Sequence, residues 1–211
     1  MTVWVRCLAL VVAIVSAAPQ RRRLPHTSPE WTIYDPFEYS SIDEFLKEYP
    51  PSRITTYQYA WIYVPSPEEE IEPGNVKRLK REWDALDAKG KATESALLQL
   101  ALKNRVLSGK WMIYRDRATI DQAWNPIARE VAAGRLGVAA KVSPYSPGTK
   151  TKNDICIYTA SFANVTEIRE LRQGLTRLGF TEPLEYKPDA FTLVGIYPGN
   201  KWGIPEGLYV E

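Results

Sequence analysis

Apolar residues recur at helical spacing in five segments of this chain. In the clearest segment, Val76, Leu79, Trp83 and Leu86 lie three or four positions apart, so one face of a helix is apolar. The residue before this stripe, Asn75, is a typical helix N-cap. The same signals predict four more helices, beginning at Ser41, at Thr93, after Asp121 and at Asn164 and ending near Tyr49, Leu107, Ala132 and Leu178.

Strand-like segments lie between and after these helices. They cover residues 54–64, 110–114, 137–143, 155–159, 184–187 and 191–197. Polar and apolar residues alternate within them, whereas strands buried on both faces of a parallel sheet form uninterrupted apolar runs. The pattern therefore predicts an α+β fold, in which an antiparallel sheet has helices packed on one face.

The first 30 residues differ in composition from the rest of the chain. Arg6 precedes an apolar run and then the small residues Ser16, Ala17 and Ala18, a layout typical of a signal peptide. The apolar run is too short for a membrane span, so we expect no stable membrane insertion. Two alternatives stay open, namely a secretion signal over residues 1–18 or an apolar extension outside the fold.

Residues 19–30 are rich in Pro, Arg, Ser and Thr, which predicts a flexible basic tether. The residues after them show no internal repeat and no sign of a second core. We therefore expect an apolar leader and tether over residues 1–30, followed by a single domain over residues 31–211.

The charge and the reactive side chains exclude several classes of function. With 27 Lys and Arg against 25 Asp and Glu the net charge is +2, so nucleic-acid binding needs a local basic patch. The only histidine, His26, lies in the tether, which excludes a histidine triad and a histidine metal site. The two cysteines, Cys7 and Cys156, form no disulfide framework, and Cys156 between two isoleucines predicts a buried reduced thiol. We therefore expect no catalytic residue, no metal and no cofactor.

Several short motifs occur in one order along the chain. They are Ser-Gly-Lys-Trp (108–111), Ala-Lys-Val-Ser-Pro (140–144), Ile-Cys-Ile-Tyr-Thr (155–159), Tyr-Lys-Pro-Asp (186–189) and Gly-Ile-Tyr-x-x-Asn-x-Trp (195–202). With them the chain resembles, over residues 31–209, the family of the basophilic leukaemia-expressed protein, also described as a domain of unknown function. That family resembles translation initiation factor 4E in fold, which implies a curved antiparallel sheet with helices packed on its convex face.

The resemblance to the initiation factor extends to individual residues. Residues 109–111 match its Gly-Gly-Arg-Trp strand start, residues 157–159 match its Ile-Trp-Thr strand end, and Lys141 matches a basic residue on the preceding strand. The factor also has a Trp-Glu pair, which stacks on the methylated guanine of the mRNA cap and accepts hydrogen bonds from it. The equivalent residues 102–107 hold neither an aromatic residue nor a carboxylate. The resemblance therefore implies the scaffold without true cap binding.

Two pairs of residues are candidates for contact with a ligand. Alternation along the strand places Lys110 and Trp111 on opposite faces, so we expect Trp111 in the core and Lys110 on the concave side facing a phosphate. The alternative for Lys110 is a solvated edge lysine. Lys187 and Asp189 share a face if their strand is regular, and form either a phosphate- or amide-binding pair beside Tyr197 or a surface ion pair.

Three aromatic residues complete the set. Tyr158, Tyr197 and Trp202 either stack on a nucleobase or lie half buried with their polar atoms satisfied. The candidate binding residues are therefore Lys110, Lys141, Tyr158, Lys187, Asp189, Tyr197, Lys201 and Trp202.

These residues favour a non-catalytic protein that binds RNA or a nucleotide on the concave face of the sheet. One alternative is a small enzyme for a phosphorylated or nucleotide-like ligand, with a lysine and Asp189 as acid–base groups. Another is a protein–protein adaptor that uses the convex helices, which an exposed apolar patch on Trp83 or its neighbours would indicate. The family resemblance implies a cytoplasmic or nuclear protein, and a true signal peptide over residues 1–18 implies a secreted one.

Overall fold

A curved seven-stranded sheet forms the centre of the molecule. The computed structural model describes residues 30–67, 71–148 and 152–211. The strand order is β1-β2-β4-β5-β3-β6-β7, and all pairs are antiparallel except β1–β2, which is parallel. The strands are β1 (Trp31–Ile33), β2 (Trp61–Pro65), β3 (Gly109–Asp116), β4 (Ala139–Val142), β5 (Lys152–Thr159), β6 (Glu185–Pro188) and β7 (Tyr209–Val210).

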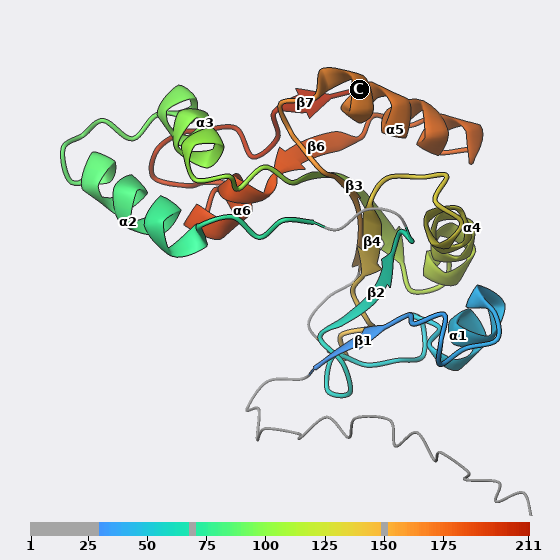
Figure 1. Ribbon diagram of the computed structural model, residues 1–211. Helices are drawn as coiled ribbons and strands as arrows, with labels where there is room; N and C mark the ends of the chain where they lie inside the picture. The colour runs from blue at the N-terminus through green and yellow to red at the C-terminus, as the bar shows by residue number, and fades with distance from the viewer. Residues whose placement is uncertain (1–29, 68–70, 149–151) are drawn as a thin grey trace, which may run out of the picture.

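Helices lie on both sides of this sheet (Figure 1). On the convex side are α1 (Ile42–Glu48), α4 (Ile120–Ala132) and α5 (Val165–Arg177), and on the concave side are α2 (Val76–Asp87), α3 (Glu94–Lys103) and α6 (Asp189–Val194). The predicted α+β class, with a curved sheet and helices on its convex face, is confirmed. Two helices of the second group, α2 and α3, were predicted, but their position on the concave side of the sheet was not expected, and neither was α6.

The central strand β3 separates the two sides through the alternation of its side chains. Trp111 and Ile113 are buried in the core, and the Trp111 indole Nε1 donates a hydrogen bond to the Ile168 carbonyl of α5 at 3.0 Å. Lys110 points the opposite way, toward α6. The predicted core position of Trp111 is therefore confirmed.

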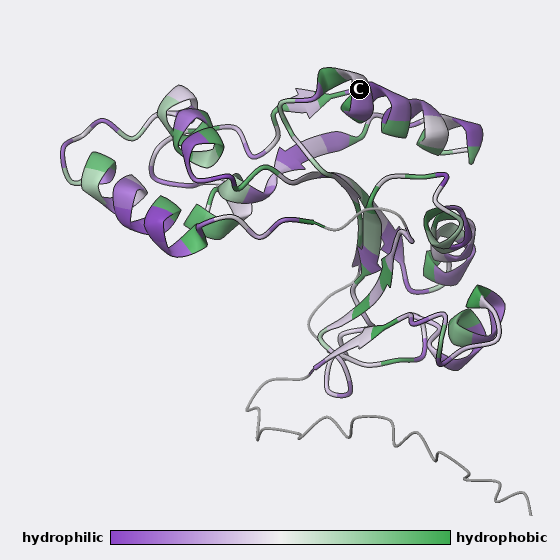
Figure 2. Ribbon diagram, in the orientation of Figure 1, coloured by the Kyte–Doolittle hydropathy of each residue, from purple (hydrophilic) through white to green (hydrophobic). Residues whose placement is uncertain are grey.

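The helix N-caps follow the sequence signals. The Asn75 side chain accepts the Arg78 N–H, the Thr93 hydroxyl accepts the Ala96 N–H, and Asn164 accepts the Glu167 N–H. Apolar residues alternate with polar ones along α2, α4 and α5, as Figure 2 shows, because each helix buries one stripe.

Two predicted strands are wrong in whole or in part. Residues 191–197 were expected to be a strand, but α6 begins at Asp189 and ends before Gly195, whose φ of 86° suits a left-handed C-cap. The helix forms because the Asp189 N–H donates to the Ser108 carbonyl and Phe191 is fully buried, so tertiary contacts override a β-like pattern. Of the strand expected over residues 54–64, only β2 and an isolated bridge from Thr55 to Tyr145 form.

The predictions for the leader and the tether fall on residues 1–29, which lie outside the described residues. Within the described part of the chain, no helix is both long and apolar enough to cross a bilayer. The predicted burial of the Cys156 thiol is confirmed, and this cysteine forms no disulfide with another described residue.

Candidate functional site

A cavity of about 400 Å³ opens on the concave side of the sheet. Its aromatic wall consists of Trp31 on β1, Tyr63 on β2 and Tyr158 on β5. Its other walls come from residues 71–76 and from α6. The lining also includes Val106, Ser108, Lys110, Lys141, Asp189, Thr192 and Leu193. This cavity therefore contains four of the predicted site residues, Lys110, Lys141, Tyr158 and Asp189.

Lys141 projects from β4 into a cage of aromatic rings. Its Nζ lies 4.0 Å from the Trp61 ring centre, 4.8 Å from that of Trp31 and 5.7 Å from that of Tyr158. No carboxylate among the described residues forms an ion pair with this ammonium. Burial lowers the pKa of Lys141 from its ordinary value, and the positive charge of Lys110 adds to this effect. The negative charges of Asp189 and Asp154 oppose this shift without forming an ion pair with Lys141, so the groups in direct contact with the ammonium are ring faces.

Lys110 has its own internal partner. Only 5% of this residue is exposed, and its Nζ donates to the Asp189 Oδ1 at 2.5 Å and to the Thr192 hydroxyl at 3.0 Å. The Ser108 hydroxyl donates to the other Asp189 oxygen at 2.5 Å. Lys110 is therefore neither a solvated edge lysine nor an unpaired phosphate contact, because a buried ion pair links β3 to α6.

Lys187 lies on β6, next to Lys110 of the neighbouring strand β3, but it does not line the cavity. It is 2% exposed, its Nζ is 3.8 Å from a Glu206 oxygen, and it sits 4.3 Å above the half-exposed Tyr197 ring. Burial lowers the pKa of Lys187. The expected pairing of Lys187 with Asp189 is absent, because the strand ends at Pro188 and Asp189 belongs to α6. The expected position of Lys187 beside Tyr197 is observed.

Lys201 and Trp202 lie away from the cavity, against α2. The Trp202 indole donates to the Asp87 Oδ1 at 2.8 Å, and the Lys201 ammonium donates to the Asp87 Oδ2 at 2.5 Å. Trp202 also packs edge-on against Trp83, with ring centres 5.2 Å apart. Trp83 is buried, so the exposed apolar patch that would indicate an adaptor is not found at this residue.

Sequence reasoning missed the aromatic residues on β1 and β2. The alternation in residues 61–64 held a signal, since Ile62 and Val64 are fully buried and Tyr63 therefore lies on the opposite face with Trp61. Trp31 gave no local signal, because it reaches the cavity only through the parallel pairing of β1 with β2.

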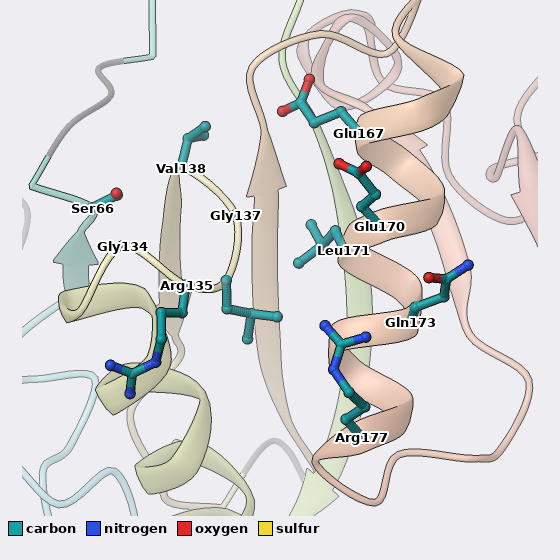
Figure 3. A pocket seen from close by; sticks show the side chains of 11 residues that line it. Ser66, Gly134, Arg135, Gly137, Val138, Glu167, Glu170, Leu171, Gln173 and Arg177 are labelled. Carbon is teal, nitrogen blue, oxygen red and sulfur yellow. The ribbon is translucent and has the colours of Figure 1, made fainter.

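A second cavity, of about 450 Å³, lies between α5 and the turn that follows α4 (Figure 3). Side chains of both charges line it, including Glu170, Arg177 and Arg135, and Arg135 is paired with Glu130 at 2.7 Å. No predicted site residue lies there. The mixed charge indicates no single ligand, so the concave cavity is the better candidate.

Metal chemistry has no visible basis in the described residues. No group of three or more His, Cys, Asp or Glu side chains in that part of the chain could hold a metal ion. The candidate site is therefore a cavity with a caged cation, an internal ion pair and an aromatic wall.

Comparison with known proteins gives two findings. The family model described as Basophilic leukemia-expressed protein Bles03 matches residues 76–195, which is more than half of the chain. Among solved structures, the chain is similar to schistosome eIF4E in its complex with m7GpppA and 4E-BP, with a TM-score of 0.39 and 18% sequence identity. That similarity covers 52% of this chain and 61% of the schistosome chain.

Proposed function

The chain belongs to the Basophilic leukemia-expressed protein Bles03 family, and we propose that it binds RNA or a nucleotide in the concave cavity. One observation carries the proposal, namely that the Lys141 ammonium projects into this cavity with no carboxylate partner among the described residues. Removing a cation from water is unfavourable unless another charge compensates it. A phosphate group supplies such a charge, and ammonium–phosphate hydrogen bonds are strong.

The aromatic wall suits the base of a nucleotide. Every nucleobase has a flat π-face, and stacking on Tyr or Trp rings is a common way to hold single-stranded or free nucleotides. Trp31 is 46% exposed and its ring lies 5.8 Å from that of Tyr63, so the wall has an accessible aromatic surface. Base stacking and a phosphate contact are thus available in one cavity.

The contacts favour binding over acid–base catalysis. Both carboxylate oxygens of Asp189 accept hydrogen bonds, one from Lys110 and one from Ser108. A general base needs a lone pair directed at the substrate, and Asp189 directs its oxygens at its own neighbours. Asp189 and Lys110 therefore support the wall of the cavity.

The proposal does not extend to the mRNA cap. The schistosome protein was solved with m7GpppA. Residues 102–107 of this chain, however, contain no counterpart of the Trp-Glu pair with which the initiation factor contacts the methylated guanine. The ligand class is RNA or a nucleotide without a requirement for methylated guanine.

A binding titration with matched lysine variants tests the proposal. Tryptophan fluorescence would be followed during titration with a panel of nucleotides and with short single-stranded RNA. We expect Lys141→Met to weaken binding about tenfold or more, the size of a lost charge-assisted hydrogen bond, while Lys152→Met, at an exposed position, binds like the wild type. Absence of binding to the whole panel, or equal affinity of Lys141→Met and wild type, rules out this function for the cavity.

A further inference from the structure

The charges that line the concave cavity cancel except for one. Among the described residues its charged lining side chains are Glu72, Lys110, Lys141 and Asp189. Lys110 is paired with Asp189, and Glu72 is paired with Arg105 at 2.7 Å. Lys141 is the remaining cation, so the described lining residues and their ion-pair partners together carry a single uncompensated positive charge.

The neighbouring lysine does not add a second free charge. Lys187 is opposite Lys110 in the register of β3 and β6, but its ammonium faces Glu206 and the Tyr197 ring. It is almost completely buried and is not part of the cavity lining. A ligand in the cavity therefore meets one available ammonium.

This balance sets the charge of the ligand. Excess charge in a partly buried site lacks both water and a partner, so it opposes binding. A phosphomonoester carries about −1.5 to −2 at neutral pH and leaves excess negative charge beside one lysine. A phosphodiester carries one negative charge and matches it. We infer that the cavity binds a single nucleotide unit whose phosphate is a diester, as in an RNA linkage or a 3′,5′-cyclic nucleotide.

The geometry places base and phosphate within reach of each other. The Lys141 ammonium lies 4.8 Å from the Trp31 ring, and Trp31 packs on Tyr63 in the same wall. The volume of about 400 Å³ lies toward the lower end of small-ligand sites, which span about 300–1,000 Å³. A cavity of this size suits one nucleotide unit. The inference rests on the proposed function and adds the charge and the number of nucleotide units.

A ligand series with one base tests the inference. Isothermal titration of the full chain would compare adenosine, AMP, ATP, 3′,5′-cyclic AMP and the dinucleotide ApA, without divalent cations. We expect at least one of the two diesters to bind at least about tenfold more tightly than ATP, because ATP brings several unpaired charges into the site. In Lys141→Met this preference should disappear, while Lys152→Met keeps it. Binding of ApA alone identifies an RNA linkage, and binding of cyclic AMP alone identifies a free cyclic nucleotide.

Other outcomes separate this inference from the proposed function. If ATP binds as tightly as the diesters in a Lys141-dependent way, the diester inference is overturned and the proposed function stands. Adenosine that binds as tightly as ApA also overturns the inference, because the phosphate is then not engaged. If none of the five ligands binds, the inference is overturned, and the proposed function is decided by the panel of nucleotides and single-stranded RNA described above.

Discussion

At the scale of single residues, the ion pair between Lys110 and Asp189 is a buried polar link between the sheet and α6. Lys110 has almost no exposure and no other charged partner among the described residues. The loss of one member of such a pair leaves a buried charge without compensation, whereas replacement of both by apolar residues is far less harmful.

We therefore expect Asp189→Asn to lower the free energy of unfolding by about 3 kcal/mol, because the Lys110 charge stays buried without a counter-charge. Ser108→Ala removes only a hydroxyl donor, so it should cost about 1 kcal/mol. Urea unfolding at neutral pH measures both. The double variant Lys110→Met, Asp189→Leu should recover most of the loss, and no recovery would contradict the ion pair as the cause.

The direction of these side chains could be predicted from the sequence, but their partners could not. Alternation along a strand correctly placed Trp111 in the core and Lys110 on the concave side. The Lys110–Asp189 contact spans 79 residues along the chain, and local periodicity carries no information at that range. Lys141 was predicted from resemblance alone, and its cage depends on Trp31, Trp61 and Tyr158 from three other strands.

At the scale of elements, the caps of α2, α3 and α5 were predicted correctly because capping is a local interaction. The boundary at the end of α3 and the whole of α6 were not. The α3 helix was expected to reach Leu107 but ends at Lys103, and Arg105 follows with a φ of 56°. This turn packs closely against Gly74, where a Cβ would lie 2.2 Å from the Arg105 carbonyl oxygen.

One carboxylate ties α2 to the end of α3. Glu82 accepts hydrogen bonds from Lys103 at 2.8 Å, Asn104 at 2.9 Å and Arg78 at 3.0 Å. These contacts, with Lys103 foremost, lower the pKa of Glu82 to about 2 from an ordinary value of 4.5. The ionised carboxylate is thus more stable in the folded chain than in the unfolded chain.

The stability from Glu82 should therefore depend on pH. An acid with a lowered pKa contributes stability above its unfolded value of 4.5, and this contribution disappears as the pH falls toward about 2. We expect Glu82→Gln to be less stable than wild type at neutral pH and equally stable near the acid end of this range. The urea midpoints of wild type and variant, measured from neutral pH down to about pH 2, give this stability difference. Glu170→Gln, at an exposed position, is the control. A pH-independent difference would mean that the carboxylate charge is not responsible.

At the scale of the whole molecule, the two groups of helices share one apolar core. A single cluster of buried residues contains Phe45 of α1, Trp83 of α2, Trp124 of α4 and Phe191 of α6, together with residues of the sheet. The prediction of a single domain over residues 31–211 thus has a direct test.

We expect one cooperative unfolding transition, because neither group of helices has a separate core. Urea unfolding followed by tryptophan fluorescence and by far-ultraviolet circular dichroism should give the same midpoint. The variants Trp83→Phe and Trp124→Phe each remove a tryptophan fluorophore from one side of the sheet. Their unfolding curves would show whether the two sides unfold at the same urea concentration. Two separate midpoints would show that the molecule unfolds as independent units, contrary to this prediction.

The long sequence separation of the cavity residues also has a consequence for biosynthesis. The cavity draws on Trp31 near one end of the chain and on Asp189 near the other, so most of the chain must be made before its walls can meet. Contacts between distant residues form late, because long loops must close first. On the ribosome, Lys110 emerges well before the carboxylate that neutralises it. A nascent chain therefore has no complete cavity until α6 has left the exit tunnel, so under the proposed function it binds its ligand only after synthesis has passed that point.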